Sequence, residues 1–313
     1  MIRSFIHLLT RHSNWPSTAV QDALEQEVYA TPKQWHTMAR SLILSLGLGW
    51  LVCGIVFFFA FNWDQLHPFV KMGLVQGIFL IFALLAWKSR LSPLIKNSLL
   101  TGAAVLIGVM FAVFGQIYQT GANAYDFFLS WYLCIVLWTI YLLFEPMWLL
   151  MMVLANITLG MYIEQETSAI QHSWIFIGFL TLNLVFYALI LWVNSAKQAL
   201  TAPWLRYVLQ IGIAALLIFG FGAGIFGKFH SSFLFFIILM IACIAAAVWV
   251  GLQQRNIVLL VITGLTVMMV VTLLLSKWMS NSFAFFILGW WVIGSLTLLV
   301  KLMLQLQKKW RDA

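Results

Sequence analysis

Beyond residue 41, long apolar segments follow one another along the chain, and only short polar turns separate them. An α-helix rises 1.5 Å per residue, so roughly 20 apolar residues cross the hydrocarbon layer of a bilayer. Hydrophobic residues make up 63% of the sequence and charged residues 8%, and the mean hydropathy is +0.99. A water-soluble core does not need this excess. We therefore expect an all-α, polytopic membrane protein.

The apolar segments predict a bundle of about ten transmembrane helices. They lie at residues 42–62, 68–87, 97–118, 127–143, 147–163, 173–193, 204–226, 232–250, 257–275 and 283–304. We expect a cytoplasmic amphipathic helical segment at 1–41, a transmembrane domain at 42–304 and a basic cytoplasmic tail at 305–313. Thr31 is a suitable N-cap for a helix that begins at Pro32. The very short turn at 144–146 predicts antiparallel neighbouring helices on its two sides.

Basic residues predict the orientation in the membrane. An even number of spans places both termini on one side, and all but three of the 17 Lys and Arg residues fall on that side. The exceptions are Lys71, Lys228 and Lys277. Because positive residues are retained in the cytoplasm, we expect both termini to be cytoplasmic. The net charge of +8 then reflects membrane topology, and we expect no nucleic-acid partner.

A weak internal similarity relates the first and third spans. Residues 54–64 resemble residues 108–118, and each stretch ends an outward-going helix in a polar turn. This similarity predicts that spans one and two and spans three and four form repeated hairpins, as transporters often do. Chance alignment of two apolar segments is the alternative.

The first polar turn, residues 62–71, brings a cation close to a helix start. Lys71 lies about one turn inside the second span, where the helix dipole and the membrane both disfavour a positive charge. Asp64 is the nearest carboxylate in the sequence, so we expect the two side chains to pair. The pair either locks this hairpin or forms part of a site open to the outside.

The second polar turn, residues 115–126, begins before the third span has clearly ended. Gly115 and Gly121 would permit a broken helix, and transporters build binding sites from such breaks. The alternative is an ordinary outer loop in which Asp126 caps the next helix.

These two turns carry a resemblance to a known family. The strings GIVFFFAFNWDQLHPFVK and GQIYQTGANAYDFFLSW resemble a bacterial family of predicted membrane proteins of unknown function, whose hallmark is an N-W-D turn after the first span. The matching positions are Asn62, Trp63, Asp64, Lys71, Gln116, Asp126 and Trp131. The resemblance covers about residues 35–145. It implies a multi-pass protein of the bacterial inner membrane, with neighbouring membrane proteins that carry a Gly-Asp-Tyr motif as partners.

Other short motifs contribute less. Gly222, Gly224 and Gly227 fit a dinucleotide-binding pattern, but no strand precedes them, so we discount it. The GxxxG pairs Gly73–Gly77 and Gly220–Gly224 predict close helix packing. The three cysteines lie far apart inside apolar spans and are expected to be apolar fillers. We predict no catalytic residue, no metal site and no cofactor.

Three classes of function remain open. The first is a transporter-like or lipid-handling protein with an outward-facing polar pocket. Its expected lining residues are Asn62, Asp64, Lys71, Gln116, Gln119, Asn123 and Asp126, with Trp63 and Tyr118 as walls. The second is a non-catalytic structural or assembly subunit, in which these side chains form a closed plug and another membrane protein is the partner. A membrane-embedded enzyme is the least favoured class, because its acid–base pair could come only from Asp64, Lys71 and Asp126. Three amide residues inside the spans are expected either to form hydrogen bonds between helices or to be polar groups of a site: Asn183, Gln76 and Gln210.

Overall fold

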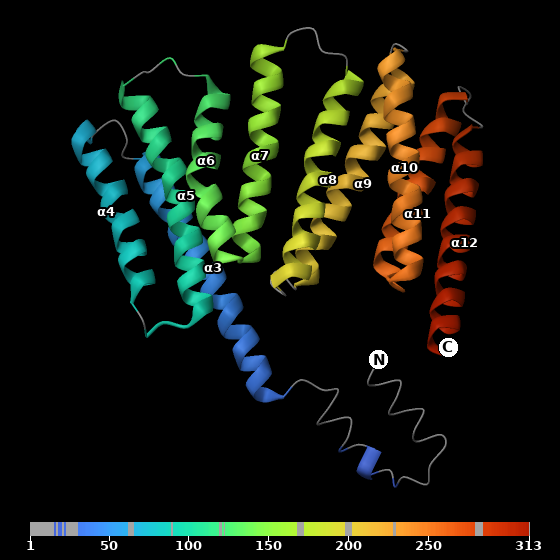
Figure 1. Cartoon of the computed structure of the whole chain (residues 1–313), viewed down its shortest axis with the longest axis horizontal. Helices are drawn as coiled ribbons and strands as arrows, with labels where there is room; N and C mark the ends of the chain where they lie inside the picture. Colours follow the sequence, from blue (N-terminus) through green and yellow to red (C-terminus); the bar gives the residue numbers. More distant parts are fainter. Residues whose placement is uncertain are drawn as a thin grey trace. The chain divides into compact units, whose positions relative to one another are not determined.

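The computed structural model of the chain describes residues 16, 18–20, 22, 31–61, 66–88, 90–118, 121, 123–167, 172–197, 202–227, 230–278 and 284–312. Its regular structure there is helical, with 10 helices that are long and apolar enough to cross a membrane (Figure 1). They are α3 Pro32–Phe61, α4 Pro68–Trp87, α5 Pro93–Tyr118, α6 Ala124–Leu142, α7 Glu145–Glu166, α8 His172–Lys197, α9 Pro203–Phe226, α10 Ser231–Gln253, α11 Ile257–Trp278 and α12 Ala284–Asp312. The prediction of an all-α polytopic protein with about ten spans is confirmed.

Prolines and capping groups determine where several helices begin. Proline opens α3, α4, α5 and α9, where its missing N–H costs no hydrogen bond. At α3, Thr31 N–H donates to Gln34 Oε1 (2.8 Å) and Gln34 N–H donates to Thr31 Oγ1 (3.3 Å), which is a capping box. The helix starting at Pro32 runs without interruption into the predicted span at 42. At the other end of the chain, α12 continues past residue 304 through the basic tail to Asp312.

Residues up to Tyr118 form one compact unit, which contains α3, α4 and α5. Small residues on α5 allow close contact with both other helices: a Cβ at Gly102 would lie 2.8 Å from Phe82 Cε2 on α4 and 3.8 Å from Leu48 Cδ2 on α3. The main helix pairs of the unit are therefore α4 with α5 and α3 with α5. Both α3 and α4 thus pack on α5, and the repeat of the first hairpin in spans three and four stays a prediction.

The third span is continuous through Gly115, as in the span predicted at 97–118, so the alternative of a helix broken at Gly115 is wrong. Helix α5 passes through Gly115 and ends at Tyr118. Val113 is buried, and Ile117 packs against the same apolar cluster on the other side of Gly115. A single glycine costs only about 1 kcal/mol of helix propensity, which such packing outweighs. Gly121, with φ of 64°, adopts the left-handed conformation after the helix instead.

Residues from Gln119 onward form the second unit, which contains α6 to α12. Leu143, with φ of 48°, and Phe144 connect α6 to α7, and these two helices form a close antiparallel pair as predicted. Helix α8 packs on α9, α9 on α11, and α11 on both α10 and α12. Glu145, in the first turn of α7, accepts a hydrogen bond from Ala202 N–H (3.3 Å) at the start of α9.

Two features predicted to hold helices together do so in this unit. The rings of Phe236 and Phe233 on α10 lie directly against Gly220 and Gly224 of α9. Between α7 and α8, the Asn183 and Asn156 side chains bond to each other, with Asn183 Nδ2 donating to Asn156 Oδ1 (2.8 Å). The other GxxxG pair, Gly73 and Gly77 on α4, has open space where a Cβ would stand.

Candidate functional site

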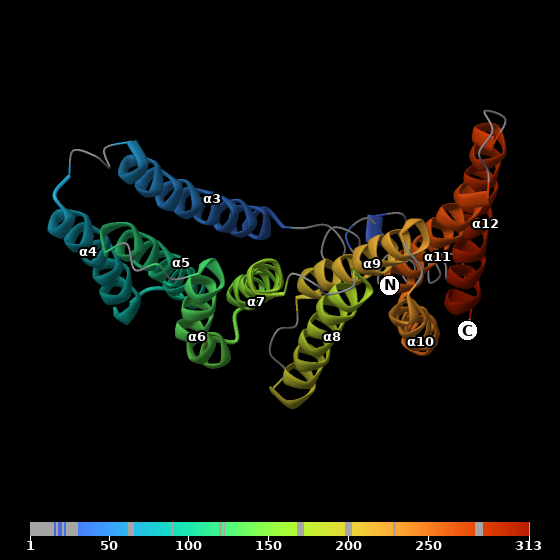
Figure 2. The ribbon, with the colours of Figure 1, turned by 90° about the horizontal axis from the view of Figure 1, so that it is seen from above.

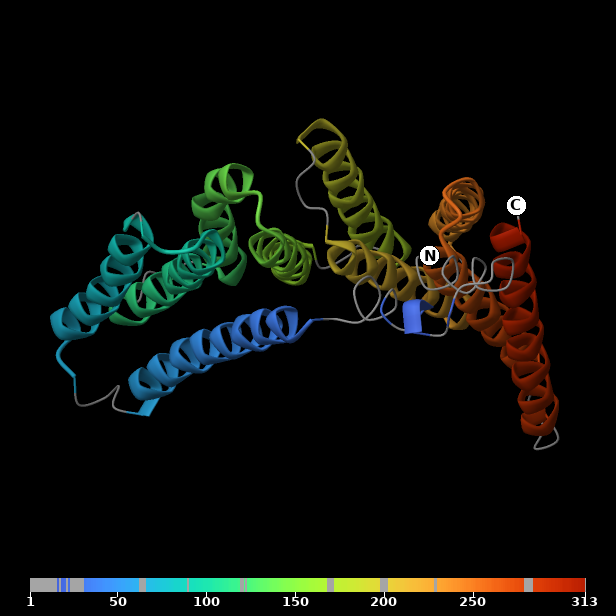
Figure 3. The same ribbon diagram turned by 90° about the horizontal axis from the view of Figure 1, so that it is seen from below.

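Helices α8 and α10 diverge along their length. Near their first turns they meet, because Trp174 stacks on Phe235 (6.0 Å between centroids) and Phe176 contacts Phe236 edge to face (6.5 Å). Toward their other ends the two helices separate (Figures 1 and 2). Both lie on the same side of α9 and α11, which form the floor between them (Figure 3). A splayed pair of helices over a helical floor leaves room for a pocket.

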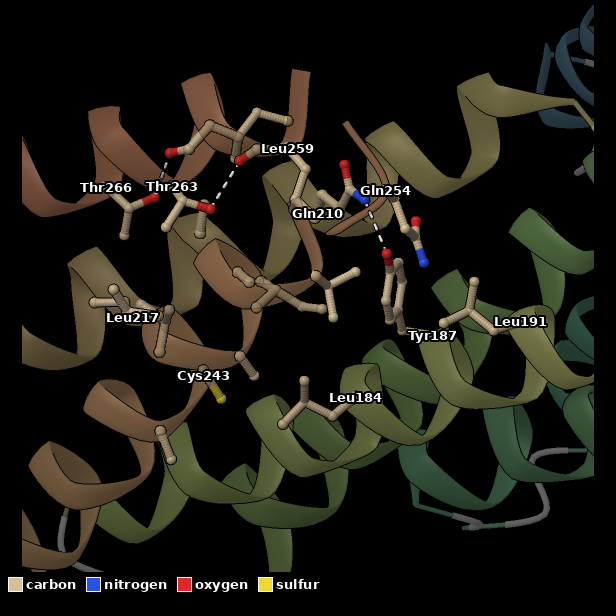
Figure 4. A pocket seen from close by; sticks show the side chains of 18 residues that line it. Leu184, Tyr187, Leu191, Gln210, Leu217, Cys243, Gln254, Leu259, Thr263 and Thr266 are labelled. Atoms are coloured by element: carbon tan, nitrogen blue, oxygen red, sulfur yellow. Dashed lines mark hydrogen bonds between the residues drawn. The ribbon is translucent and has the colours of Figure 1, made fainter. Parts of the chain in front are cut away.

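Such a pocket, with a volume of about 430 Å³, lies among these four helices (Figure 4). Pockets of roughly 300–1,000 Å³ are typical of sites for small molecules. Most of its walls are aliphatic. Its lining consists of Leu184, Tyr187 and Leu191 from α8; Gln210, Ile213, Ala214 and Leu217 from α9; Ala242, Cys243, Ile244, Ala246, Ala247 and Val250 from α10, with Gln254 following that helix; and Leu259, Ile262, Thr263 and Thr266 from α11.

Small side chains on α10 create the space. Ala242, Cys243, Ala246 and Ala247 face the pocket, where leucine or phenylalanine would fill it. At the end where α8 and α10 meet, the larger side chains of Phe233 and Phe236 pack in one apolar cluster with Leu180 and Leu217. Ala242 and Ala246 are exposed, so the pocket reaches the surface along α10.

A tyrosine and a glutamine form the buried polar end of the pocket. Gln210 Nε2 donates to Tyr187 Oη at 2.9 Å (Figure 4). Gln210 is only 7% exposed, and its Oε1 is buried with no hydrogen-bond donor among the described residues. A buried acceptor without a donor costs about 1–3 kcal/mol, so this atom is a strong site for a donor from a bound molecule.

The remaining polar groups of the lining are already satisfied or lie at the rim. Thr263 Oγ1 donates to Leu259 O and Thr266 Oγ1 to Ile262 O, each at 2.8 Å, within α11. Gln254 is exposed at the turn after α10. The lining contains no Asp, Glu, Lys, Arg or His. With no charged acid or base beside it, this site suits binding rather than acid–base catalysis.

Nine residues were predicted to line an outer polar pocket. Some of them belong to the first unit, some belong to the second, and others lie outside the described residues. Asn62, Trp63, Asp64 and Gln119 lie outside the described residues, so the Asp64–Lys71 pair stays a prediction. Lys71 is buried (8% exposed) in the first turn of α4, where it has at least one interaction partner. Met72 and Ile117 pack against one apolar cluster, which brings this turn next to the end of α5, where Gln116 and Tyr118 are exposed.

The other two predicted residues surround the start of α6. Asn123 precedes this helix, and its Nδ2 donates to Glu166 Oε1 (3.1 Å) at the end of α7. Asp126 lies in the first turn of α6 and not at its N-cap, because the helix begins three residues earlier than the sequence indicates. The convergence of turns 62–71 and 116–126 into one pocket stays a prediction.

Sequence reasoning left Gln210 as either a hydrogen-bonding group between helices or a polar group of a site, and it missed Tyr187 and the α10 alanines as parts of a pocket. The signal was present in two places. Gln210 is an amide within an apolar span, and residues 242–247 read Ala-Cys-Ile-Ala-Ala-Ala, a run of small side chains. What the sequence does not contain is the divergence of α8 from α10, which sets these residues around an empty volume.

Comparison with known proteins identifies a family for part of the chain. Residues 17–148 match the model of a family described as predicted membrane protein (DUF2157), whose function is unknown. The match confirms the resemblance to a family of uncharacterised membrane proteins over this segment. The pocket among α8 to α11 lies beyond the matched residues. No curated protein and no solved structure matches the chain.

Proposed function

We propose that this multi-pass membrane protein is a lipid-handling protein that binds a lipid-like molecule in the pocket among α8, α9, α10 and α11. The observation that carries the proposal is a pocket of about 430 Å³ with aliphatic walls, which reaches the surface of helices suited to span a membrane. A hydrocarbon chain is the ligand that such walls fit, and a bilayer supplies it at high concentration.

The absence of charge in the lining argues against an ion or a sugar-phosphate as ligand. Coupled transporters place ionisable residues along the substrate path, where they pair with the substrate or carry protons. The residues that line this pocket include no Asp, Glu, Lys, Arg or His. Binding and release of an apolar molecule require no such groups.

The competing proposal is an assembly subunit whose groove receives a transmembrane helix of a neighbouring protein. One observation favours it: the exposed Ala242 and Ala246 of α10 would allow another helix to approach closely. The two proposals differ in what lies against Ala246 in the native membrane, so a cross-link from that position separates them.

The test of lipid binding uses a pair of adjacent substitutions on α10. Ala247 lines the pocket and is half-buried, whereas Ala245 is exposed and does not line it. Native mass spectrometry of the purified protein, after extended washing in detergent, measures lipid that stays bound. We expect wild type and Ala245→Trp to retain lipid, and Ala247→Trp to lose it because the indole fills the pocket. Size-exclusion profiles of the two variants report whether each remains folded.

Equal retention by Ala247→Trp and wild type, or no retained lipid in wild type, would refute lipid binding at this pocket. The second measurement places a photoreactive benzophenone amino acid at Ala246 in intact cells. A lipid adduct supports the lipid-handling proposal. A discrete protein adduct at this position supports the assembly subunit and overturns the first proposal.

A further inference from the structure

We infer that the pocket selects a lipid whose polar head is an uncharged hydroxyl group, bound between Gln210 and Tyr187. This inference rests on the lipid-binding function proposed above and adds the chemical class of the ligand. Candidates of this class are long-chain alcohols and acylglycerols with a free hydroxyl, in which one neutral group both donates and accepts a hydrogen bond.

The geometry of Gln210 requires a donor from the ligand. Its side chain is only 7% exposed, its Nε2 is occupied by Tyr187 Oη (2.9 Å), and its Oε1 lacks a donor among the described residues. A ligand hydroxyl that reaches Oε1 and donates to it would remove the penalty of this unsatisfied acceptor. An alkane in the pocket would leave the penalty in place.

Tyr187 supplies the complementary group. Its oxygen accepts from Gln210, which leaves its own O–H hydrogen to donate to a ligand. A hydroxyl head can donate to Gln210 and accept from Tyr187 at once. If the Gln210 amide is rotated so that Oε1 faces Tyr187, the free group becomes an N–H donor, and a hydroxyl satisfies that arrangement as well. A head group that only donates or only accepts cannot satisfy both Gln210 and Tyr187.

The lining disfavours a charged head. A carboxylate has no hydrogen to donate to Gln210 Oε1 and finds no cation in the lining, and an ammonium finds no carboxylate there. Arg206 is the nearest cation along α9, one turn before Gln210, but it does not line the pocket. A preference for anionic heads would therefore place the head beyond the polar end of the pocket, toward Arg206.

The experiment compares ligands that share one hydrocarbon chain and differ only in their head group. The full-length protein in phosphatidylcholine nanodiscs is photolabelled with hexadecanol carrying a mid-chain diazirine, in competition with unlabelled hexadecanol, hexadecanoate, hexadecylammonium or hexadecane. Adducts are located by mass spectrometry of peptides from α8 to α11. We expect hexadecanol to compete on the order of tenfold better than the other three, which corresponds to about 1.4 kcal/mol.

Two variants test whether Gln210 and Tyr187 cause the preference for hexadecanol. Gln210→Leu and Tyr187→Phe should each reduce the advantage of hexadecanol over hexadecane to near one, while hexadecane competes as it does with wild type. Unchanged hexadecane competition shows that the pocket is still folded. A hexadecanol advantage that survives in Gln210→Leu would overturn the assignment to Gln210.

The outcomes separate failure of this inference from failure of the proposed function. Equal competition by all four compounds in wild type means that the pocket binds hydrocarbon chains without distinguishing their head groups. The inference then fails, and lipid binding stands. Stronger competition by hexadecanoate also overturns the inference, in favour of an anionic head near Arg206. Adducts outside the pocket, or adducts that persist in Ala247→Trp, show that the proposed lipid-binding function itself is wrong.

Discussion

The two GxxxG pairs predict opposite effects for the same substitution. In Gly220→Ala, the new Cβ would lie 2.5 Å from Phe236 Cζ and 3.0 Å from Phe176 Cβ. Carbon atoms pack best at about 3.5–4.0 Å, so the Phe236 ring must move by roughly 1 Å. That ring is fully buried (0% exposed) in the cluster that contains Leu180 and Phe233, and it has little room to move.

The magnitude follows from two opposing effects. Overpacking a filled core costs about 1–3 kcal/mol, and replacing a helical glycine with alanine returns about 1 kcal/mol. We therefore expect Gly220→Ala to lower the free energy of unfolding by up to about 2 kcal/mol. At Gly77 no atom lies within 4 Å of the new Cβ, so only the helix propensity changes and Gly77→Ala should raise stability by up to about 1 kcal/mol.

The assay is reversible unfolding of the purified protein in mixed micelles by increasing mole fraction of sodium dodecyl sulfate, followed by circular dichroism. Thermal aggregation of the same variants provides an independent ranking. Because both substitutions add one methyl group to a glycine in an apolar helix, differences in solubility cancel. If Gly220→Ala proves as stable as Gly77→Ala, the close contact of α9 with Phe236 and Phe176 does not limit packing and the reasoning is refuted.

Two further predictions concern interhelical bonding and orientation. Asn183→Leu should destabilise the α7–α8 contact by about 0.6–1.7 kcal/mol, and adding Asn156→Leu should cost less than the sum of the single changes, because the stranded amide is removed; additive effects in the same unfolding assay would disprove the coupling. In a cysteine-free background, a cysteine at Gln165 should react with a membrane-impermeant maleimide in intact cells while one at Trp310 should not. Labelling at position 310 would reverse the predicted topology.

Helix number and several helix starts could be read from the sequence because local features determine them. Span length and hydropathy predicted the ten long helices, and Thr31 before Pro32 predicted the start of α3 with its cap. The turn at 144–146 was too short for any arrangement of α6 and α7 other than antiparallel neighbours. Each of these features depends on residues within a few positions of each other.

The packing partners and the pocket depended on the tertiary structure. Inside a membrane, surfaces that face lipid and surfaces that face another helix are equally apolar, so hydropathy does not mark which face packs. Hydropathy therefore did not indicate that α3 packs on α5. The sequence also showed Gly73–Gly77 and Gly220–Gly224 as equivalent motifs, although only the second pair contacts neighbouring rings.

By itself, then, the sequence determined that this chain is a multi-pass helical membrane protein, because apolar length is a property of each segment taken alone. Phe236 of α10 packs against Gly220 of α9 and against Phe176 of α8, which holds α8 and α10 together near their first turns. Toward their other ends α8 and α10 diverge, and the angle between them leaves the pocket that Gln210 lines. Contacts between segments far apart in the chain set this angle, so the candidate site exists only at the level of the folded structure.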